Sequence, residues 1–255
     1  MRAAFFDLDK TVIVKSSLVA LGPELHAHGL LRRRTLIRAG LSQLWFQRFG
    51  ADEERLQKIR TSVLKITQGW DRDEVRRLVK ETISEVIEPL LYAEALELVD
   101  HHLAQGEEVY LVSSAPAEIV EPFAELLGIT GAISSRATID EQGKFTGEME
   151  FFAQGAHKAT AIVELARERG IDLAESSAYS DSETDVAMLE VVGHPYAVNP
   201  DRVLARIAHE RQWPILTFSH PVTALRRSKS HTPFIVSAVL VGVAAALGGV
   251  RFQRR

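Results

Sequence analysis

Short apolar runs alternate with helical segments through the second half of the chain. Strands that alternate with helices in this way form a mostly parallel sheet with helices on both faces. The pattern therefore predicts an α/β fold with an open, Rossmann-like parallel sheet. The segments expected to be strands are 108–114, 176–180, 194–198 and 213–218, and those expected to be helices are 93–105, 116–127, 156–169, 183–191 and 201–211. Residues 130–151 carry a turn at Asp140–Gly143 and predict a small hairpin.

The first half of the chain has a different pattern. Residues 2–8 predict one short buried strand, after which residues 14–91 show apolar side chains only at three- and four-residue spacing. A block of helices without a strand indicates an inserted all-helical cap subdomain. The catalytic core is then expected to consist of residues 1–13 and 92–218.

Two carboxylates one residue apart, Asp7 and Asp9, follow the first strand. Burying such charges costs free energy unless they are paired or bind a metal. Ligands of open parallel sheets bind beyond the carboxyl ends of the strands, so we expect compensating groups at the same edge. The side chains that the predicted topology brings there are Asp7, Asp9, Ser113, Ser114, Asp181, Asp185 and Lys158. The carboxylate oxygens in this set suit Mg²⁺, and we expect Asp7 and Asp181 to share the ion.

Four motifs in this set resemble those of the haloacid dehalogenase (HAD) superfamily of phosphatases. They are DLDKT (7–11), VYLVSS (109–114), Lys158 and YSDSETD (179–185). The helical insertion after the first motif is similar to that of subclass IB, which contains phosphoserine phosphatase. The likeness extends over residues 3–218 and is greatest to actinobacterial proteins that often carry a C-terminal apolar segment.

The resemblance implies a role for each motif residue. Asp7 would be the nucleophile that forms an aspartyl-phosphate, and Asp9 the general acid and base. The groups that would bind the substrate phosphate are Ser113, Ser114, Thr11 and Lys158. Mg²⁺ would be held by Asp7, by the backbone carbonyl of Asp9 and by Asp181, with Asp185 in support. The implied reaction is Mg²⁺-dependent hydrolysis of a small phosphorylated metabolite.

Several positions depart from the phosphoserine phosphatase pattern. Ser16 stands where those enzymes carry a glutamate that recognises the amino group of serine. Ser114-Ala115 replaces a pair of glycines, Ser180 replaces a glycine, and Thr184 replaces an asparagine. The motif residues that would carry the phosphoryl chemistry are retained, whereas phosphoserine itself is not indicated as the substrate.

The C-terminal region predicts a membrane anchor. A polar, basic linker at 219–232 leads into residues 233–250, an uncharged stretch flanked by arginines and lysine. Its length is at the lower limit for a transmembrane helix, and it lacks the polar face of an amphipathic helix docked on a protein surface. We expect a single-pass helix with the catalytic part in the cytoplasm. Ala238, Gly242 and Ala246 recur every fourth residue and could pair two such helices in a homodimer.

Two alternatives follow from the same residues. The anchor, together with a basic cluster at Arg32, Arg33, Arg34 and Arg38, fits a membrane-tethered phosphatase for a lipid or lipid-precursor phosphate. The acids, hydroxyls and lysine also fit a phosphorylatable regulatory or binding protein. The net charge of −4 gives no indication of a nucleic-acid partner. The chain has no cysteine, which excludes disulfides and metal sites built on thiolates.

Overall fold

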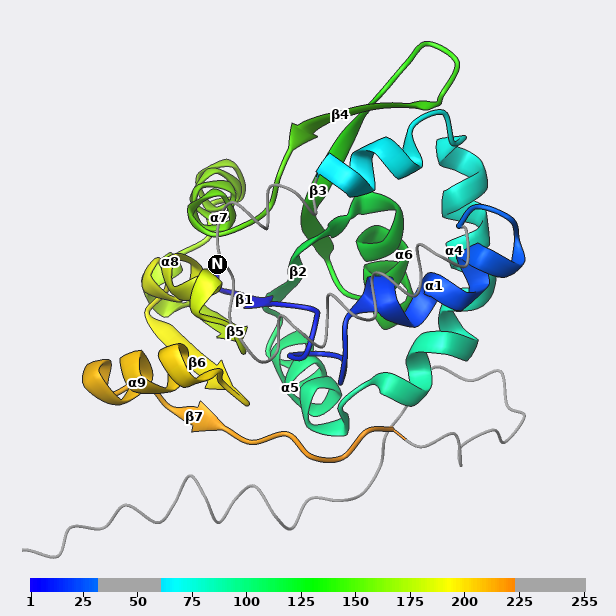
Figure 1. Ribbon diagram of the computed structural model, residues 1–255. Coiled ribbons are helices and arrows are strands. Elements are labelled where there is room, and N and C mark those ends of the chain that lie inside the picture. The colour runs from blue at the N-terminus through cyan, green and yellow to red at the C-terminus, as the bar shows by residue number, and fades with distance from the viewer. Residues whose placement is uncertain (32–60, 223–255) are drawn as a thin grey trace, which may run out of the picture. The chain divides into compact units, whose positions relative to one another are not determined.

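A seven-stranded sheet lies at the centre of the chain (Figure 1), and its strand order is β4-β3-β2-β1-β5-β6-β7. The computed structural model describes residues 1–31 and 61–222, which lie within one compact unit, Met1–Ala224. All neighbouring strands of this sheet run parallel except β3 and β4, which are antiparallel. The strands are β1 (Ala3–Phe6), β2 (Glu108–Pro116), β3 (Gly131–Ile139), β4 (Phe145–Phe151), β5 (Ser177–Ser180), β6 (His194–Val198) and β7 (Ile215–Leu216). The predicted open, mostly parallel sheet is confirmed.

Helices cover both faces of the sheet, as the alternating pattern predicts. One face packs against α5 (Ala93–Ala104) and α6 (Ala117–Leu127), and α1 (Ser17–Ala27) and α4 (Arg72–Ile87) extend the same hydrophobic cluster, with α4 packed on α6. The opposite face packs against α7 (Ala156–Arg169), α8 (Val186–Glu190) and α9 (Arg202–Arg211). Side chains of β1 alternate between the two layers, with Phe6 in the first and Phe5 in the second. Three short 3-10 helices also lie in the described part of the chain, η1 (Glu88–Leu90), η2 (Leu173–Glu175) and η3 (Glu183–Asp185), and residues 61–67 are α-helical.

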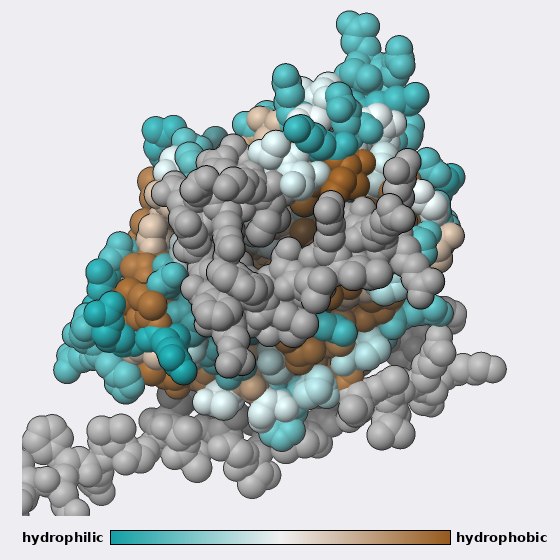
Figure 2. All heavy atoms as spheres, in the orientation of Figure 1, coloured by the Kyte–Doolittle hydropathy of each residue, from teal (hydrophilic) through white to brown (hydrophobic). Residues whose placement is uncertain are grey.

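The predicted hairpin is confirmed as β3 and β4. Its turn at 140–143 is fastened by Asp140, whose carboxylate accepts hydrogen bonds from the amides of Gln142 and Lys144, both at 2.9 Å. Gly143 has a φ of 78°, a left-handed conformation that suits glycine. The hydrophilic top of the molecule in Figure 2 contains this exposed turn, which is drawn at the top of Figure 1.

Two predicted elements are shorter than expected. The helix predicted at 183–191 begins as the 3-10 turn η3, where Ser182 accepts a hydrogen bond from the amide of Thr184, and only α8 is α-helical. The last strand was predicted at 213–218, but β7 has two residues. Phe218 instead exchanges two hydrogen bonds with the side chain of Asn199, at 3.0 and 2.9 Å, and this amide takes the place of a strand partner.

The described part of the helical insertion is attached to the core along α4. Asp71 is the N-cap of α4, as its position before acidic residues suggests, and accepts a hydrogen bond from Glu74 N at 2.9 Å. α4 packs against α6, and ion pairs connect the two helices. These pairs are Arg72–Glu118, Arg76–Glu121, Arg76–Glu125 and Lys80–Glu125. The division between a cap at 14–91 and the core stays a prediction.

Three segments meet where the insertion joins the core: 12–14, 90–92 and 220–222. The first two segments are the outgoing and returning connections of the insertion, and the third follows β7. Their hydrogen bonds run from the amides of Val14, Tyr92, Ala93 and Val222 to the carbonyls of Leu90, Val12, His220 and Leu91, respectively, at 2.7–2.9 Å. We call residues 217–222 the C-terminal strap, because they bind the returning connection from the opposite end of the sequence.

The C-terminal apolar segment falls outside the described residues, as do Arg32, Arg33, Arg34 and Arg38. Within residues 1–31 and 61–222, no helix has the length and apolar character needed to cross a membrane.

The strap yields a stability prediction at Phe218, which is 7% exposed and packs edge-on against Tyr92 with ring centroids 5.8 Å apart. Replacing Phe218 with alanine removes this contact and leaves a cavity. We expect Phe218→Ala to lower the free energy of unfolding by about 3 kcal/mol, measured by urea denaturation, and Phe218→Leu to lower it by about 1 kcal/mol. An alanine variant as stable as the original protein would show that the strap does not contribute to folding.

Candidate active site

The candidate site lies at the carboxyl end of β1, where the strand order reverses. Here β1 has β2 on one side and β5 on the other, which opens a crevice for a ligand at this edge in folds of this kind. Asp7 follows β1 directly, and its amide donates to the carbonyl of Tyr179 in β5 at 2.9 Å. The nucleophile predicted from the sequence is therefore fixed to the central strands through its backbone.

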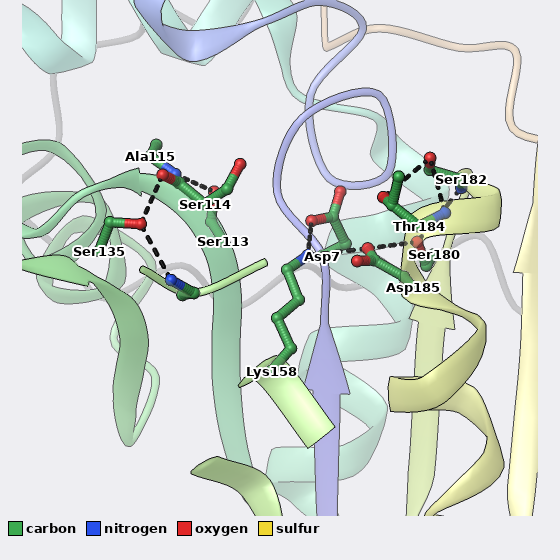
Figure 3. A network of polar contacts seen from close by, with 11 residues as sticks. Asp7, Ser113, Ser114, Ala115, Ser135, Lys158, Ser180, Ser182, Thr184 and Asp185 are labelled. Atoms are coloured by element: carbon green, nitrogen blue, oxygen red, sulfur yellow. Dashed lines mark hydrogen bonds and ion pairs between the residues drawn. The ribbon is translucent and has the colours of Figure 1, made fainter. Parts of the chain in front are cut away.

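Lys158 reaches Asp7 from the first turn of α7. Its Nζ donates to Oδ1 of Asp7 and to Oδ2 of Asp185, both at 2.7 Å (Figure 3). The three side chains are buried, with Lys158 3%, Asp7 7% and Asp185 2% exposed. The sequence prediction that these residues meet is confirmed by this contact, although 151 positions separate Asp7 from Lys158.

The electrostatics of this cluster follow from burial and from the surplus of acids. Burial raises the pKa of Asp7 well above its usual range, and Asp185 and Asp181 raise it further, whereas Lys158 opposes them. Burial alone would lower the pKa of Lys158, but Asp185 and Asp7 outweigh it, so that this pKa is raised. Lys158 is therefore a firmly protonated cation, and the site favours additional positive charge.

Asp181 follows β5 and lies beside the same cluster. Its nearest cation is Lys10, whose Nζ is 4.0 Å from Oδ2 of Asp181. Burial raises the pKa of Asp181 to about 7, Lys10 opposes the shift, and Asp185 and Asp201 add to it. The loop around Asp181 is held by Asp201, which accepts from Glu183 N through Oδ2 and donates its own amide to the carbonyl of Asp181, both at 2.8 Å.

Asp9 is anchored at the start of α1. Its Oδ1 accepts a hydrogen bond from the amide of Ser17 at 2.9 Å. Burial raises the pKa of Asp9, and the hydrogen bonds from Ser17 lower it in part. This shift favours the protonated form of Asp9, which is the form that a general acid needs.

The second motif lies in the last part of β2, on the other side of Asp7 (Figure 3), where the pairing with β3 is irregular between Ser113 and Pro116. Ser113 is buried and its Oγ accepts a hydrogen bond from the amide of Ala115 at 3.1 Å, while Ser114 is exposed. Ser135 in β3 holds this end of β2, because its Oγ donates to the carbonyl of Ser114 at 2.8 Å and accepts from Ala153 N at 3.1 Å. Both predicted serines lie at the sheet edge, and only Ser114 faces solvent.

Thr11 differs in its surroundings from the other predicted phosphate ligands. Its side chain is fully buried, and within the described part of the chain its Oγ1 has no hydrogen-bond partner. This placement fits a residue that packs under the turn after Asp9. A direct contact of Thr11 with phosphate stays a prediction.

Sequence reasoning assigned no role at the site to Ser135, Ser180 and Asp201. Ser180 lies within the fourth motif, where the sequence indicates only that it replaces a glycine, Ser135 lies in a segment identified only as a strand, and Asp201 has the position of an ordinary helix cap. The one available signal was proximity in sequence, because Ser180 directly precedes Asp181. A hydroxyl before a candidate metal ligand is common enough to carry little weight alone.

Comparison with protein families identifies a match over residues 4–190 to the haloacid dehalogenase-like hydrolases. A Streptomyces azureus protein named for inhibition of morphological differentiation is 44% identical, over 97% of this chain and 91% of its own length. A protein of Mycobacterium tuberculosis (strain ATCC 25618 / H37Rv) named a probable phosphatase is 43% identical, over 97% and 86%. A phosphoserine phosphatase of the same strain is 33% identical, over 99% and 82%.

Solved structures share the fold. A Bordetella pertussis protein of unknown function superposes with a TM-score of 0.72 at 26% identity, over 85% of this chain and 98% of that one. A phosphoserine phosphatase that carries an analogue of the phospho-aspartyl intermediate superposes with a TM-score of 0.58 at 19% identity, over 85% and 92%. The second likeness concerns the arrangement of the elements alone.

The geometry of the Lys158 cluster generates a prediction about stability. Removing the cation in Lys158→Met leaves two buried carboxylates facing each other without a donor. We expect the free energy of unfolding, measured in the absence of added metal, to fall by about 3–5 kcal/mol.

The double variant Lys158→Met/Asp185→Asn is the matched control, because it removes one of the two stranded charges. It should recover part of the lost stability. Equal stability of Lys158→Met and the original protein would contradict the pairing.

Proposed function

The chain belongs to the haloacid dehalogenase-like hydrolases and is an enzyme of phosphatase type, and from this premise we propose that it cleaves phosphate monoesters with Asp7 as the nucleophile. The observation that carries the proposal is the contact of 2.7 Å between Lys158 Nζ and Asp7 Oδ1. A phosphate dianion approaches a carboxylate only where cations offset the repulsion. Lys158 supplies such a cation at the attacking group.

The first half of the reaction forms a covalent intermediate. A carboxylate oxygen of Asp7 bonds to phosphorus while the bond from phosphorus to the ester oxygen breaks. Asp9 gives its proton to the departing alkoxide, which leaves as an alcohol, and Asp7 carries the phosphoryl group. The raised pKa of Asp9 and its position two residues from Asp7 support this role.

The second half returns the enzyme to its starting state. Asp9, now ionised, takes a proton from a water molecule, whose oxygen attacks phosphorus. The bond between phosphorus and Asp7 breaks, and inorganic phosphate leaves. Lys158 stays paired with Asp185 through both halves, which keeps its charge at the phosphoryl oxygens while Asp7 is neutral in the ester.

The donor set fits Mg²⁺ as the cofactor. Asp7 and Asp181 are buried acids whose pKa values are raised by burial, so a divalent cation between them offsets an unfavourable surplus of charge. Among residues 1–31 and 61–222, no group of three His, Cys, Asp or Glu side chains is arranged to hold a metal. Mg²⁺ needs no such group, because it commonly takes one or two carboxylates and keeps several waters. Asp7, Asp181 and the carbonyl of Asp9 would hold it, and bound Mg²⁺ would neutralise charge on the phosphoryl oxygens.

The substrate we infer is a small phosphorylated metabolite. Relatives named phosphoserine phosphatase and histidinol-phosphatase support this class, since both names describe small phosphate esters. Ser16, the N-cap of α1, carries no charge that would pair with the amino group of phosphoserine. We therefore propose the phosphoserine phosphatase-like reaction without phosphoserine as the preferred ester.

A second candidate is a membrane-tethered phosphatase of a lipid or lipid-precursor phosphate. The uncharged stretch at 233–250 and the basic residues around it favour this alternative. It places the same chemistry at a lipid surface, with the catalytic part on the cytoplasmic side and paired helices as a route to a homodimer. A third class, a phosphorylatable regulatory protein, would accept one phosphoryl group at Asp7 without releasing it.

The decisive variant is Asp7→Asn, because an amide cannot act as the nucleophile. We expect Mg²⁺-dependent hydrolysis of p-nitrophenyl phosphate by the full chain, and a fall in kcat/KM of about a thousandfold or more in the variant. Asp100→Asn on the exposed side of α5 is the matched control and should keep full activity. A panel that includes phosphoserine, histidinol phosphate and lipid phosphates then identifies the ester, and incorporation of one phosphate without turnover would favour the regulatory class.

The proposed anchor predicts a change in fractionation. The full chain, expressed in a bacterial cell and separated by ultracentrifugation, should sediment with membranes, whereas a chain that ends at residue 232 should stay in the supernatant. The physical reason is the transfer of about eighteen uncharged residues into the bilayer. A full chain found in the supernatant would rule out the anchor and leave the proposed chemistry untouched.

A further inference from the structure

Ser180 is a buried hydroxyl residue beside the candidate site that the proposed chemistry does not use. It is the last residue of β5, is fully buried, and directly precedes Asp181. Its Oγ donates to Oδ2 of Asp185 at 2.8 Å and accepts a hydrogen bond from the amide of Ser182 at 3.3 Å. Both hydrogen-bonding functions of the hydroxyl are thus engaged by the loop that follows β5.

The same oxygen of Asp185 receives two donors. Lys158 Nζ approaches Oδ2 of Asp185 from α7 at 2.7 Å, and Ser180 Oγ approaches it from β5. A continuous series of contacts therefore connects Ser180 to Asp185, Asp185 to Lys158, and Lys158 to Asp7, as Figure 3 shows. Each member of the series is less than a tenth exposed.

This arrangement limits where Asp185 can point. Asp185 is the last residue of the one-turn helix η3, and its side chain has two rotatable bonds. A lysine on a long flexible stem would follow the carboxylate if it rotated, and so cannot fix its direction alone. Ser180 stands on the rigid central sheet. Its short side chain offers a donor from one direction and can orient the carboxylate.

We propose that Ser180 is a positioning residue for the phosphatase reaction, a role that rests on the proposed function. Ser180 holds Asp185, and Asp185 holds the ammonium group of Lys158 at the oxygen of Asp7 that faces it. Without the hydroxyl, Asp185 keeps Lys158 as a partner but can turn away from β5 and draw Lys158 off Asp7. The reaction then loses charge stabilisation in the transition state, whereas the nucleophile and the general acid keep their own backbone contacts.

The hydroxyl also closes the loop that carries Asp181. Asp181 lies between Ser180 and Ser182, and the bond from Ser182 N to Ser180 Oγ spans it. Ser182 and Thr184 continue the network, with their hydroxyl oxygens 3.1 Å apart. The Ser180 side chain thus contacts the loop just after Asp181 and also contacts Asp185, and Asp181 and Asp185 are the two aspartates of the fourth motif. Ser180 is fully buried, so its role in the proposal is to hold Asp185 and not to attack the substrate.

The test measures kcat and KM for p-nitrophenyl phosphate with the full chain in Mg²⁺. We expect Ser180→Ala to lower kcat about tenfold, the loss that corresponds to one hydrogen bond to a charged group, with KM changed less than about threefold. Ser180→Thr keeps the hydroxyl and should retain more activity than Ser180→Ala. An unchanged kcat in folded Ser180→Ala would overturn the inference alone, whereas no turnover by the original protein on a broad ester panel would overturn it together with the proposed function.

Ser176 provides a matched control for a merely structural role. It is also a fully buried serine, next to the start of β5, and its Oγ accepts from Ala3 N at 3.0 Å and donates to the carbonyl of Asp172 at 2.6 Å. Ser176→Ala should lower the melting temperature and leave kcat unchanged. An equal loss of kcat in both alanine variants would show that Ser180 acts through general stability, which contradicts the proposal.

A double-mutant cycle tests the route through Asp185. In the Asp185→Asn background, whose activity is itself reduced, loss of the Ser180 hydroxyl should change kcat less than about twofold, because the oriented carboxylate is already gone. Independent, multiplicative losses from Ser180→Ala and Asp185→Asn would overturn the assignment. The cycle compares folded variants only, which circular dichroism and the melting temperature establish for each one.

Discussion

One buried ammonium group holds the candidate site together. Lys158 lies between the carboxylates of Asp7 and Asp185 in a region closed to water, with Asp181 nearby. Removing ions from water costs several kcal/mol for each ion, and only close, well-directed partners compensate that cost. Three acids and one lysine still leave a surplus of negative charge, and this surplus favours the binding of a divalent cation. The cation and Lys158 together can then attract a phosphate dianion.

The fold is arranged so that distant parts of the sequence meet at this charge. Because β1 lies in the middle of the sheet with β2 and β5 beside it, Asp7 comes next to the loops that follow both neighbours. The same edge also needs groups that hold those loops still. Ser135 fastens the last part of β2, and Asp201 and Ser180 fasten the loop after β5. The candidate site residues and the groups that hold them therefore come from several elements, and β5 supplies members of both sets.

The outline of this arrangement could be predicted from the sequence, and its supports could not. Asp7, Asp181, Asp185 and Lys158 are charged residues at strand ends and a helix start, where a buried charge demands a partner, so strand positions alone bring them together. A serine such as Ser180 gives no comparable signal, since its hydroxyl can satisfy itself locally and costs little at a surface. The shortened β7 was missed for a similar reason, because Asn199 replaces a strand partner with its side chain, a substitution that no periodic pattern records.

The C-terminal strap links these observations to the rest of the chain. Segments 12–14 and 90–92, which carry both connections of the helical insertion, pair with each other, and segment 220–222 pairs with the second of them. The outgoing connection begins only a few residues after Asp7 and Asp9. Backbone hydrogen bonds of this kind are directional, so a displacement of the strap must break them or move residues 90–92 with it. Val222 is thus bonded to the base of the insertion at Leu91. From there, the hydrogen bond between Tyr92 and Val12 leads to the segment that follows the proposed nucleophile Asp7.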